Sequence, residues 1–145
     1  LTKSSFGKFY QAVLWGIPGK SQDVLEDYLV KDGRTNKSRV TKKEEKDAKK
    51  AILSYQLLKD SVDDGQEVSL VHIKLETGRH HQIRVQMSNA GWPLYGDTKY
   101  NPAFQETKEH VQTALCAYKL SFVHPKTKKV MEFCIKPDNS MLNAE

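Results

Sequence analysis

The sequence predicts an α+β domain that consists mainly of antiparallel or mixed strands with one or two short helices. Several short segments rich in β-branched and aromatic residues are separated by Gly, Pro and Asp turn signals. One segment, which follows Gly78, has the apolar spacing of an amphipathic helix instead. With 145 residues, of which 38% are hydrophobic, we expect a single domain over 1–145.

The first predicted strand is Phe9 to Trp15. Apolar side chains on both of its faces are typical of a central strand, and Gly16 with Pro18-Gly19 ends it. Val24 to Val30 is the second expected strand. From Lys31 to Lys50 the chain holds Lys or Arg at nine positions and few large apolar residues. This composition predicts an exposed loop or a partly disordered insertion at about 31–50.

A strand is expected again at Ala51 to Leu58, with a helix as the alternative for this short apolar run. Asp63-Asp64-Gly65 then supplies a hairpin turn, and Val68 to Leu75 alternates like a half-buried strand. Further strands are expected at Ala114 to Val123 and at Val130 to Ile135. Together these segments make the antiparallel part of the predicted fold.

The predicted helix follows Thr77-Gly78, which ends the preceding strand and offers a helix cap. From Arg79 onward, Ile83, Met87 and Ala90 recur at i, i+4 and i+7, which places them on one apolar face. Gly91 ends the helix.

The charge balance is basic, since Lys plus Arg exceed Asp plus Glu by 23 − 18 = 5. Such a domain is compatible with nucleic acid, anionic lipid or acidic substrates. No apolar run reaches the length of a membrane span. Cys116 and Cys134 show no CxxC spacing and are typical of buried thiols in an intracellular protein. Because the chain begins with Leu rather than Met, we expect a piece of a longer protein.

The segment from Thr77 to Arg84 is the main candidate for chemistry. A helix N-terminus favours an anion, and Arg79, expected in the first turn, can contact a phosphate through two nitrogens. Arg84 flanks the apolar face and needs a buried acidic partner there. The alternative is that both arginines are ordinary surface charges. His80 and His81 would point roughly 100° apart on a helix, so no metal site is expected.

Two further positions have a chemical and a structural interpretation. Tyr10 can stack on a base or exchange a proton through its hydroxyl, but a strand tyrosine is otherwise a core residue. Asp97 follows Gly96 and is expected to cap a tight turn. The basic 31–50 segment is a solvated loop, or alternatively an arm that follows phosphate groups.

Several motifs in order resemble the RluA-type pseudouridine synthase family. The most specific is Leu75 to Arg84, which is similar to the family pattern L-x-T-G-R-[ST]-H-Q-I-R, followed by a match to G-x-P-[IL]-x-G-D-x-x-Y. The matching segments are Lys8, Tyr10 and Ala12 with Gly16; Lys50-Ala51 leading into Tyr55-Gln56-Leu57-Leu58; Leu75–Arg84; Gly91–Tyr100; and Leu120–Pro125.

This resemblance implies part of the pseudouridine synthase fold and an enzyme that isomerises uridine in RNA, either rRNA or tRNA, without cofactor or metal. It also implies a cytoplasmic location, with no membrane partner. Arg84 resembles the arginine that pairs with the catalytic aspartate, and Tyr10 the tyrosine that stacks on the target base. The resemblance places Ile83 in the wall of the base pocket. The positions it assigns to RNA contact are Lys8, Arg79, His81 and Gln82.

The sequence departs from the family pattern at three points. The segment H-R-L-D-x-x-[TV]-S-G, which carries the nucleophilic aspartate and normally precedes the Tyr10 strand, does not occur in these 145 residues. His80 occupies a position that is usually Ser or Thr, and Gln86 replaces a common His. We therefore expect the C-terminal part of a catalytic domain, whose aspartate a longer chain supplies. The alternative is an RNA-binding remnant, or pseudoenzyme, without catalysis.

Overall fold

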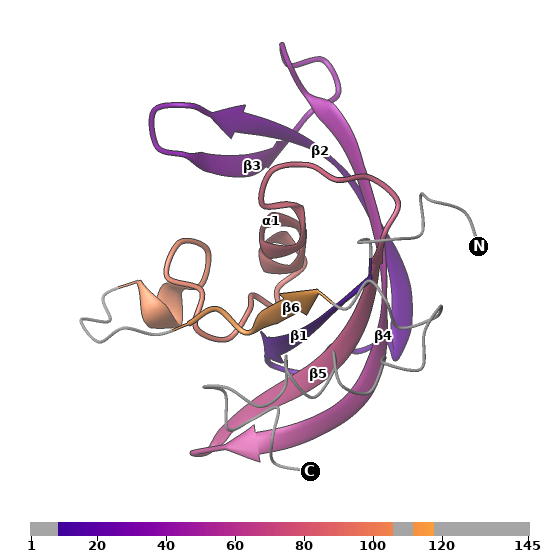
Figure 1. Ribbon diagram of the computed structural model, residues 1–145, viewed down its shortest axis with the longest axis vertical. Helices are drawn as coiled ribbons and strands as arrows, with labels where there is room; N and C mark the ends of the chain where they lie inside the picture. Colours follow the sequence, from indigo (N-terminus) through magenta and orange to yellow (C-terminus); the bar gives the residue numbers. More distant parts are fainter. Residues whose placement is uncertain (1–8, 106–111, 118–145) are drawn as a thin grey trace.

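A computed structural model describes residues 9–105 and 112–117 of the chain. Its strands form one six-stranded sheet in the order β3-β2-β4-β5-β1-β6, with all neighbours antiparallel (Figure 1). The elements are β1 (Phe9–Trp15), β2 (Gln22–Asp32), β3 (Lys37–Thr41), β4 (Lys49–Asp63), β5 (Gln66–Leu75), α1 (Gln82–Asn89), the 3-10 turn η2 (Pro102–Phe104) and β6 (Leu115–Ala117). The predicted α+β class with a mainly antiparallel sheet is confirmed.

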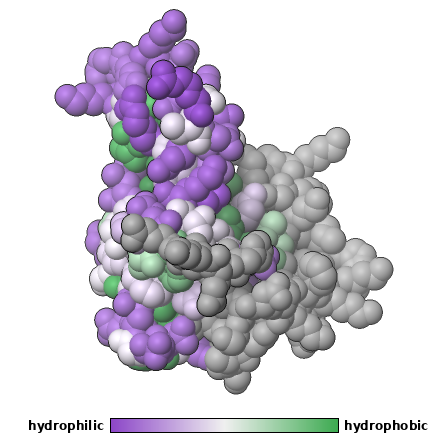
Figure 2. Space-filling view, turned by 90° about the vertical axis from the view of Figure 1, so that its left-hand side faces the viewer, coloured by the Kyte–Doolittle hydropathy of each residue, from purple (hydrophilic) through white to green (hydrophobic). Residues whose placement is uncertain are grey.

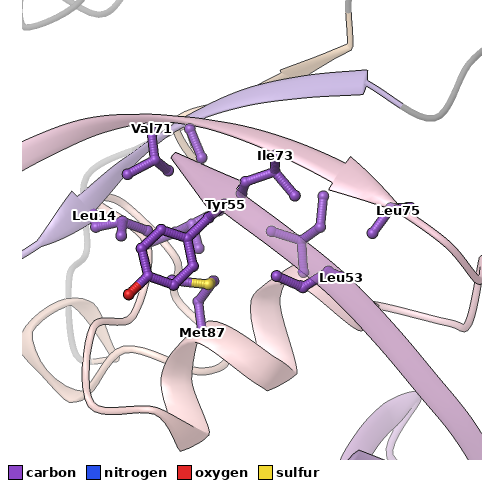
Figure 3. Close-up of a cluster of buried hydrophobic side chains, with 10 residues drawn as sticks. Leu14, Leu53, Tyr55, Val71, Ile73, Leu75 and Met87 are labelled. Carbon is purple, nitrogen blue, oxygen red and sulfur yellow. The ribbon is translucent and has the colours of Figure 1, made fainter. Parts of the chain in front are cut away.

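The sheet curves around α1, which lies on its concave side (Figure 1). Alternate residues of β1, β4 and β5 point to this side and form the main core with Ile83 and Met87 of α1 (Figure 3). The strand members of this core are Ala12, Leu14, Leu53, Tyr55, Val71, Ile73 and Leu75. Val13 packs in a separate cluster with Val68, so β1 is apolar on both faces, as its sequence predicts.

The β4–β5 hairpin turns where the sequence predicts it. Asp64 and Gly65 both have positive φ, at 51° and 84°, and Asp63 pairs with Gln66 across the turn. Two successive residues with positive φ define the type I′ turn, whose twist suits a hairpin. Since β4 runs through Ala51 to Leu58, the strand interpretation of that segment is correct and the helix alternative is wrong.

The segment 31–50 is not the exposed loop or disordered insertion that its composition predicts. β2 continues to Asp32, and β3 pairs with it from Tyr28↔Thr41 to Asp32↔Lys37. Most side chains here are exposed, but Ser38 is buried and Val40 packs against a small cluster that contains Leu29. Backbone pairing with β2 orders this edge strand without a large apolar contribution of its own.

The helix begins three residues later than predicted. Its first residue is Gln82, and His81 is the N-cap, with φ 54° and a carbonyl that accepts from Val85 N at 2.9 Å. Arg79 therefore lies in a loop and not in the first helical turn. The predicted end is correct: Gly91, with φ 103°, allows Trp92 N to donate to Met87 O at 3.0 Å and close the last turn.

Several other expectations meet the structure only in part. Leu115–Ala117 is the described portion of the strand predicted at Ala114 to Val123, whereas Lys8, residues 118–123 and the strand expected at 130–135 lie outside the described residues. Cys116 is half-buried and disulfide-bonded, so its prediction as a buried free thiol is wrong. No helix within the described residues is long and apolar enough to cross a membrane.

Candidate functional site

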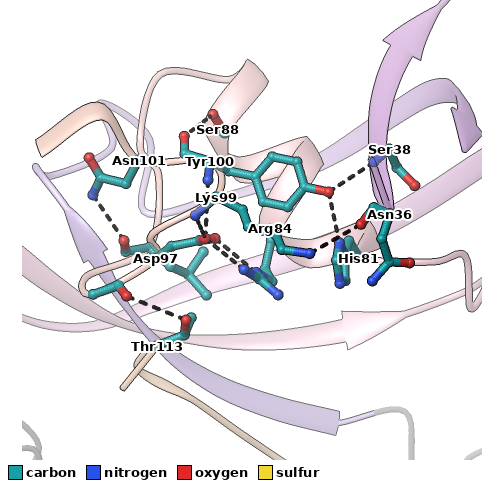
Figure 4. A network of polar contacts seen from close by, with 12 residues as sticks. Asn36, Ser38, His81, Arg84, Ser88, Asp97, Lys99, Tyr100, Asn101 and Thr113 are labelled. Carbon is teal, nitrogen blue, oxygen red and sulfur yellow. Dashed lines mark hydrogen bonds and ion pairs between the residues drawn. The ribbon is translucent and has the colours of Figure 1, made fainter. Parts of the chain in front are cut away.

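The centre of the site is an ion pair between Arg84 on α1 and Asp97 in the loop after the helix (Figure 4). Arg84 Nε donates to Asp97 Oδ2 at 2.9 Å, and Nη2 donates to Oδ1 at 2.7 Å. The Arg84 side chain is 19% exposed, and Asp97 is fully buried. The acidic partner that the position of Arg84 requires is therefore present.

Asp97 also performs the turn-capping role expected from its sequence. Its Oδ1 accepts from the backbone N–H groups of Lys99 at 3.0 Å and Tyr100 at 3.1 Å. Burial raises the pKa of Asp97, but the hydrogen bonds and charge of Arg84, with the two backbone donors, outweigh it and leave the pKa lowered. Asp97 is thus an ionised anchor with four hydrogen bonds and no exposed oxygen.

Tyr100 links this pair to the β2–β3 hairpin. The Arg84 guanidinium lies 5.2 Å from the centre of the Tyr100 ring, and the Tyr100 hydroxyl accepts from Ser38 N at 2.9 Å. The same hydroxyl is hydrogen-bonded to His81 Nδ1 at 2.7 Å. Lys99 Nζ donates a hydrogen bond to Asn36 O at 3.3 Å. Lys99 and Tyr100, which both follow Asp97, therefore bind the β2–β3 hairpin (Figure 4).

His80 and His81 are stacked, with ring centres 3.8 Å apart, and do not diverge as they would on a helix. His80 Nδ1 is hydrogen-bonded to Ser38 Oγ at 2.8 Å. Burial first, and then the positive charges of Arg84 and Lys99 nearby, lower the pKa of His81 to about 4. His81 is therefore neutral at pH 7. Within 9–105 and 112–117, no group of three or more His, Cys, Asp or Glu side chains is arranged so that it could hold a metal ion.

Gln82 supports the loop before α1 and does not face a ligand. Its side chain is 2% exposed, and Oε1 accepts from Thr77 Oγ1 and from Arg79 N, each at 2.9 Å. Nε2 donates to Ile52 O at 3.1 Å and to Gln86 Oε1 at 2.9 Å. Because all four hydrogen-bonding positions of the amide are filled, the predicted contact of Gln82 with RNA does not fit its surroundings.

Arg79 is exposed, and its Nε donates to Lys50 O at 2.8 Å, which fixes the guanidinium beside the start of β4. Tyr10 is half-buried on β1 and packs against the same core cluster as Ile83. Ile83 itself is 4% exposed. The structure brings Tyr10 and Ile83 to one cluster, whereas Tyr10 and Arg84 share no hydrogen bond within the described residues.

Sequence reasoning missed three members of the site. The sequence predicts that Asp97 caps a turn but not that it pairs with Arg84. It gives Tyr100 no role beyond its place in the motif, and it gives Ser38 no role. One sequence signal that favours the pair is the requirement of Arg84 for a buried acid. A second signal is the position of Asp97, which follows a helix-ending Gly91 by six residues.

The described part of the chain is a curved antiparallel sheet that encloses one helix, and a basic motif lies in the loop before that helix. The family model for RNA pseudouridylate synthase matches residues 1–89, more than half of the chain. The chain therefore belongs to the RNA pseudouridylate synthase family.

Individual relatives agree with this membership. The chain is 35% identical over 133 residues to an uncharacterized RNA pseudouridine synthase, YlyB, of Bacillus subtilis, covering 92% of this chain and 41% of that protein. It is 31% identical over 147 residues to ribosomal large subunit pseudouridine synthase D of Buchnera aphidicola, covering 92% of this chain and 43% of that protein. In structure it is similar to human RNA pseudouridylate synthase domain containing 1, with a TM-score of 0.68 and 26% identity. The match covers 80% of this chain and 49% of the human chain.

The chain spans less than half the length of these relatives.

Proposed function

We propose that this chain is part of an enzyme that isomerises uridine to pseudouridine in RNA, without a metal or cofactor. Family membership supports the reaction, and the relatives named as ribosomal large subunit enzymes favour rRNA over tRNA as the substrate. Such an enzyme acts inside the cell, where its RNA is. In this proposal the nucleophilic aspartate comes from sequence outside these 145 residues.

The observation that carries the proposal is the way Arg84 is held. Asp97 occupies the Nε and Nη2 positions, so the outer edge of the guanidinium, with Nη1, remains able to meet a second carboxylate. Asp97 cannot be the nucleophile because it is buried and fully hydrogen-bonded. In the proposed site Arg84 pairs with the incoming aspartate and keeps it ionised.

The surrounding charge supports an ionised carboxylate at this place. Asp97 carries a negative charge that partly cancels the charge of Arg84. Even so, the pKa values of His80 and His81 are both lowered, first by burial and then by the positive charges of Arg84 and Lys99. The local potential is thus positive. The target base must leave its stack, which costs a few kcal/mol. In our proposal Tyr10 stacks on that base and Ile83 helps to wall its pocket, while Arg79 and His81 face the RNA.

The test uses a longer protein that contains this chain and the aspartate segment that the proposal requires, with RNA tritiated at uridine C5, from which isomerisation releases tritium. We expect Arg84→Ala to lower turnover by at least about a hundredfold while RNA binding stays nearly unchanged. Arg39→Ala, which removes an exposed arginine paired with Glu45, is the control and keeps full turnover. Near-normal turnover of Arg84→Ala overturns the role of Arg84. No tritium release from the unaltered protein, with RNA binding intact, favours the non-catalytic RNA-binding alternative.

A further inference from the structure

A hollow of about 340 Å³ lies between the β2–β3 hairpin and the loop that leads into α1. Its charged and polar lining comes from Lys31, Ser38, Asp47, Lys49, Arg79 and His80. Neither Arg84 nor Asp97 lines it, so it is separate from the ion pair at the centre of the site. The β2–β3 hairpin lies at the upper end of the molecule in Figure 1, and Figure 2 shows that hydrophilic residues gather at this end.

Strand register explains why two lysines meet there. Leu29 pairs with Lys49 across β2 and β4, and Lys31 pairs with Ser38 across β2 and β3. Cross-strand partners share a face, and Lys31 is two residues from Leu29, so Lys31 and Lys49 lie on the same face. Leu29 packs against Val85 of α1, which identifies this face as the concave one. Diagonal neighbours of this kind are about 7–8 Å apart.

The positive charges in the hollow are not neutralised by the part of the chain that the structure describes. Lys31 and Lys49 are exposed and form no salt bridge with a described carboxylate, whereas Lys50, on the other face, pairs with Glu26 at 3.3 Å. Arg79 forms no ion pair within the described ranges either, and its Nε bond to Lys50 O leaves both Nη groups for a ligand. Asp47 is the single carboxylate of the lining against three cations.

The pKa of His80 agrees with an excess of positive charge. Burial lowers it first, and the charges of Lys31, Lys99 and Arg84 lower it further. His80 is therefore neutral near pH 7, with its Nδ1 bound to Ser38 Oγ. A neutral imidazole beside three cations adds a hydrogen-bonding group to the hollow without adding repulsion.

We propose that this hollow binds the phosphate backbone of RNA through Lys31, Lys49 and Arg79, which rests on the proposed function in taking RNA as the ligand. A guanidinium with two available Nη groups suits two phosphate oxygens, and lysines supply further point charges. The lysines are spread along a diagonal of the sheet and open to solvent. This arrangement suits successive groups of a polymer better than it suits a single small anion.

The experiment measures binding of a fluorescent RNA stem-loop to the full chain at several salt concentrations. The test variant is Lys31→Gln/Lys49→Gln. The control is Lys20→Gln/Lys59→Gln, which removes the same charge near the opposite ends of β2 and β4. We expect the test variant to bind about tenfold more weakly and the slope of log K against log salt to fall by about 1–2, because two phosphate contacts are lost. The control keeps the affinity and slope of the unaltered chain.

An equal loss in both variants overturns the proposal, since it indicates diffuse attraction rather than a site. An unchanged test variant, or an unaltered chain that binds no RNA, also overturns it. In a second arm, inorganic phosphate replaces chloride at constant ionic strength. We expect it to displace RNA no better than chloride; strong displacement would assign the hollow to free phosphate instead.

The outcome stays distinguishable from that of the proposed function. Tritium release by the longer protein with both lysines intact tests the isomerisation, whereas the affinity and salt dependence of RNA binding by the Lys31→Gln/Lys49→Gln variant test the hollow. If RNA binding is weakened in the Lys31→Gln/Lys49→Gln variant but the longer protein releases no tritium, the proposed isomerisation is wrong and the proposed RNA-binding role of the hollow stands. If the longer protein releases tritium but the test variant binds RNA as tightly as the unaltered chain, the proposed isomerisation stands and the proposed role of the hollow is wrong.

Discussion

Arg84 and Asp97 form a side-on pair, with Nε to Oδ2 at 2.9 Å and Nη2 to Oδ1 at 2.7 Å. Bringing these two charges out of water offsets much of their attraction, so the pair contributes orientation more than net stability. Tyr100 covers the guanidinium at 5.2 Å, and the backbone N–H of Tyr100 binds the same carboxylate. Arg84 is thus fixed from two sides before any ligand arrives.

Breaking this pair from one side should be costly. Asp97→Asn leaves the Arg84 guanidinium largely buried without a counter-charge, and we expect a loss of about 3 kcal/mol in the free energy of unfolding. Urea unfolding followed by circular dichroism measures it. Glu45→Gln is the control because it breaks the exposed pair with Arg39, which should change stability little. Similar small effects of the two substitutions would contradict the importance of the buried pair.

Stability should fall as the pH drops from about 6.5 to about 4, and His81 should carry part of this fall. Its pKa is lowered to about 4 in the folded chain, first by burial and then by neighbouring positive charge. An unfolded histidine titrates near 6.5, so between these values the unfolded chain binds more protons. The contribution of His81 is therefore complete above about pH 6.5 and lost toward pH 4.

His81→Gln is the variant that tests this pH dependence. Unfolding free energies measured between pH 4 and pH 7 should show a smaller slope in the variant than in the unaltered chain. His72→Gln is the comparison, because burial alone lowers the pKa of His72 and it lies on β5, away from Arg84. If the slope of His81→Gln equals that of the unaltered chain, His81 does not stay neutral in the fold.

Gln82 should be essential to the loop that presents Arg79. Gln82→Met keeps the size of the side chain but removes its four hydrogen bonds, which leaves buried polar groups of Thr77 and Ile52 without these partners. We expect a loss of about 2–3 kcal/mol in the free energy of unfolding. Gln56→Met, on the exposed side of β4, is the control and should have little effect. A loss no greater than the control's would mean that the loop holds its shape without Gln82.

Patterns local in sequence predicted most of the sheet, because alternation and turn residues act over a few neighbours. The strands predicted at Phe9–Trp15 and Val68–Leu75 and the turn predicted at Asp63-Asp64-Gly65 agree with the structure for this reason, although β5 begins two residues earlier, at Gln66. β3 was missed because its order comes from pairing with β2 and from Ser38, contacts that composition does not express.

The site was predictable in part for the same reason. The need of Arg84 for an acid follows from its own position, but the identity of that acid depends on how the chain turns over the next 13 residues. The helix α1 starts at Gln82 and not at Arg79 as predicted, because Gln82 Oε1 accepts hydrogen bonds from Thr77 Oγ1 and Arg79 N. These bonds hold residues 79–81 in a loop. Side-chain bonds of this kind leave no periodic signal in a sequence.

The Tyr100 hydroxyl should hold β3 against the loop before α1. It accepts from Ser38 N at 2.9 Å and is bonded to His81 Nδ1 at 2.7 Å, so Tyr100→Phe leaves a partly buried N–H without this acceptor. We expect faster hydrogen exchange at the Ser38 amide and a loss of about 1–2 kcal/mol in the free energy of unfolding. Tyr28→Phe is the control, since Tyr28 lies in the neighbouring β2 and its hydroxyl makes no hydrogen bond to a described residue. Equal protection of Ser38 in both variants would show that Lys99 and His80 hold the hairpin without Tyr100, through their bonds to Asn36 and Ser38.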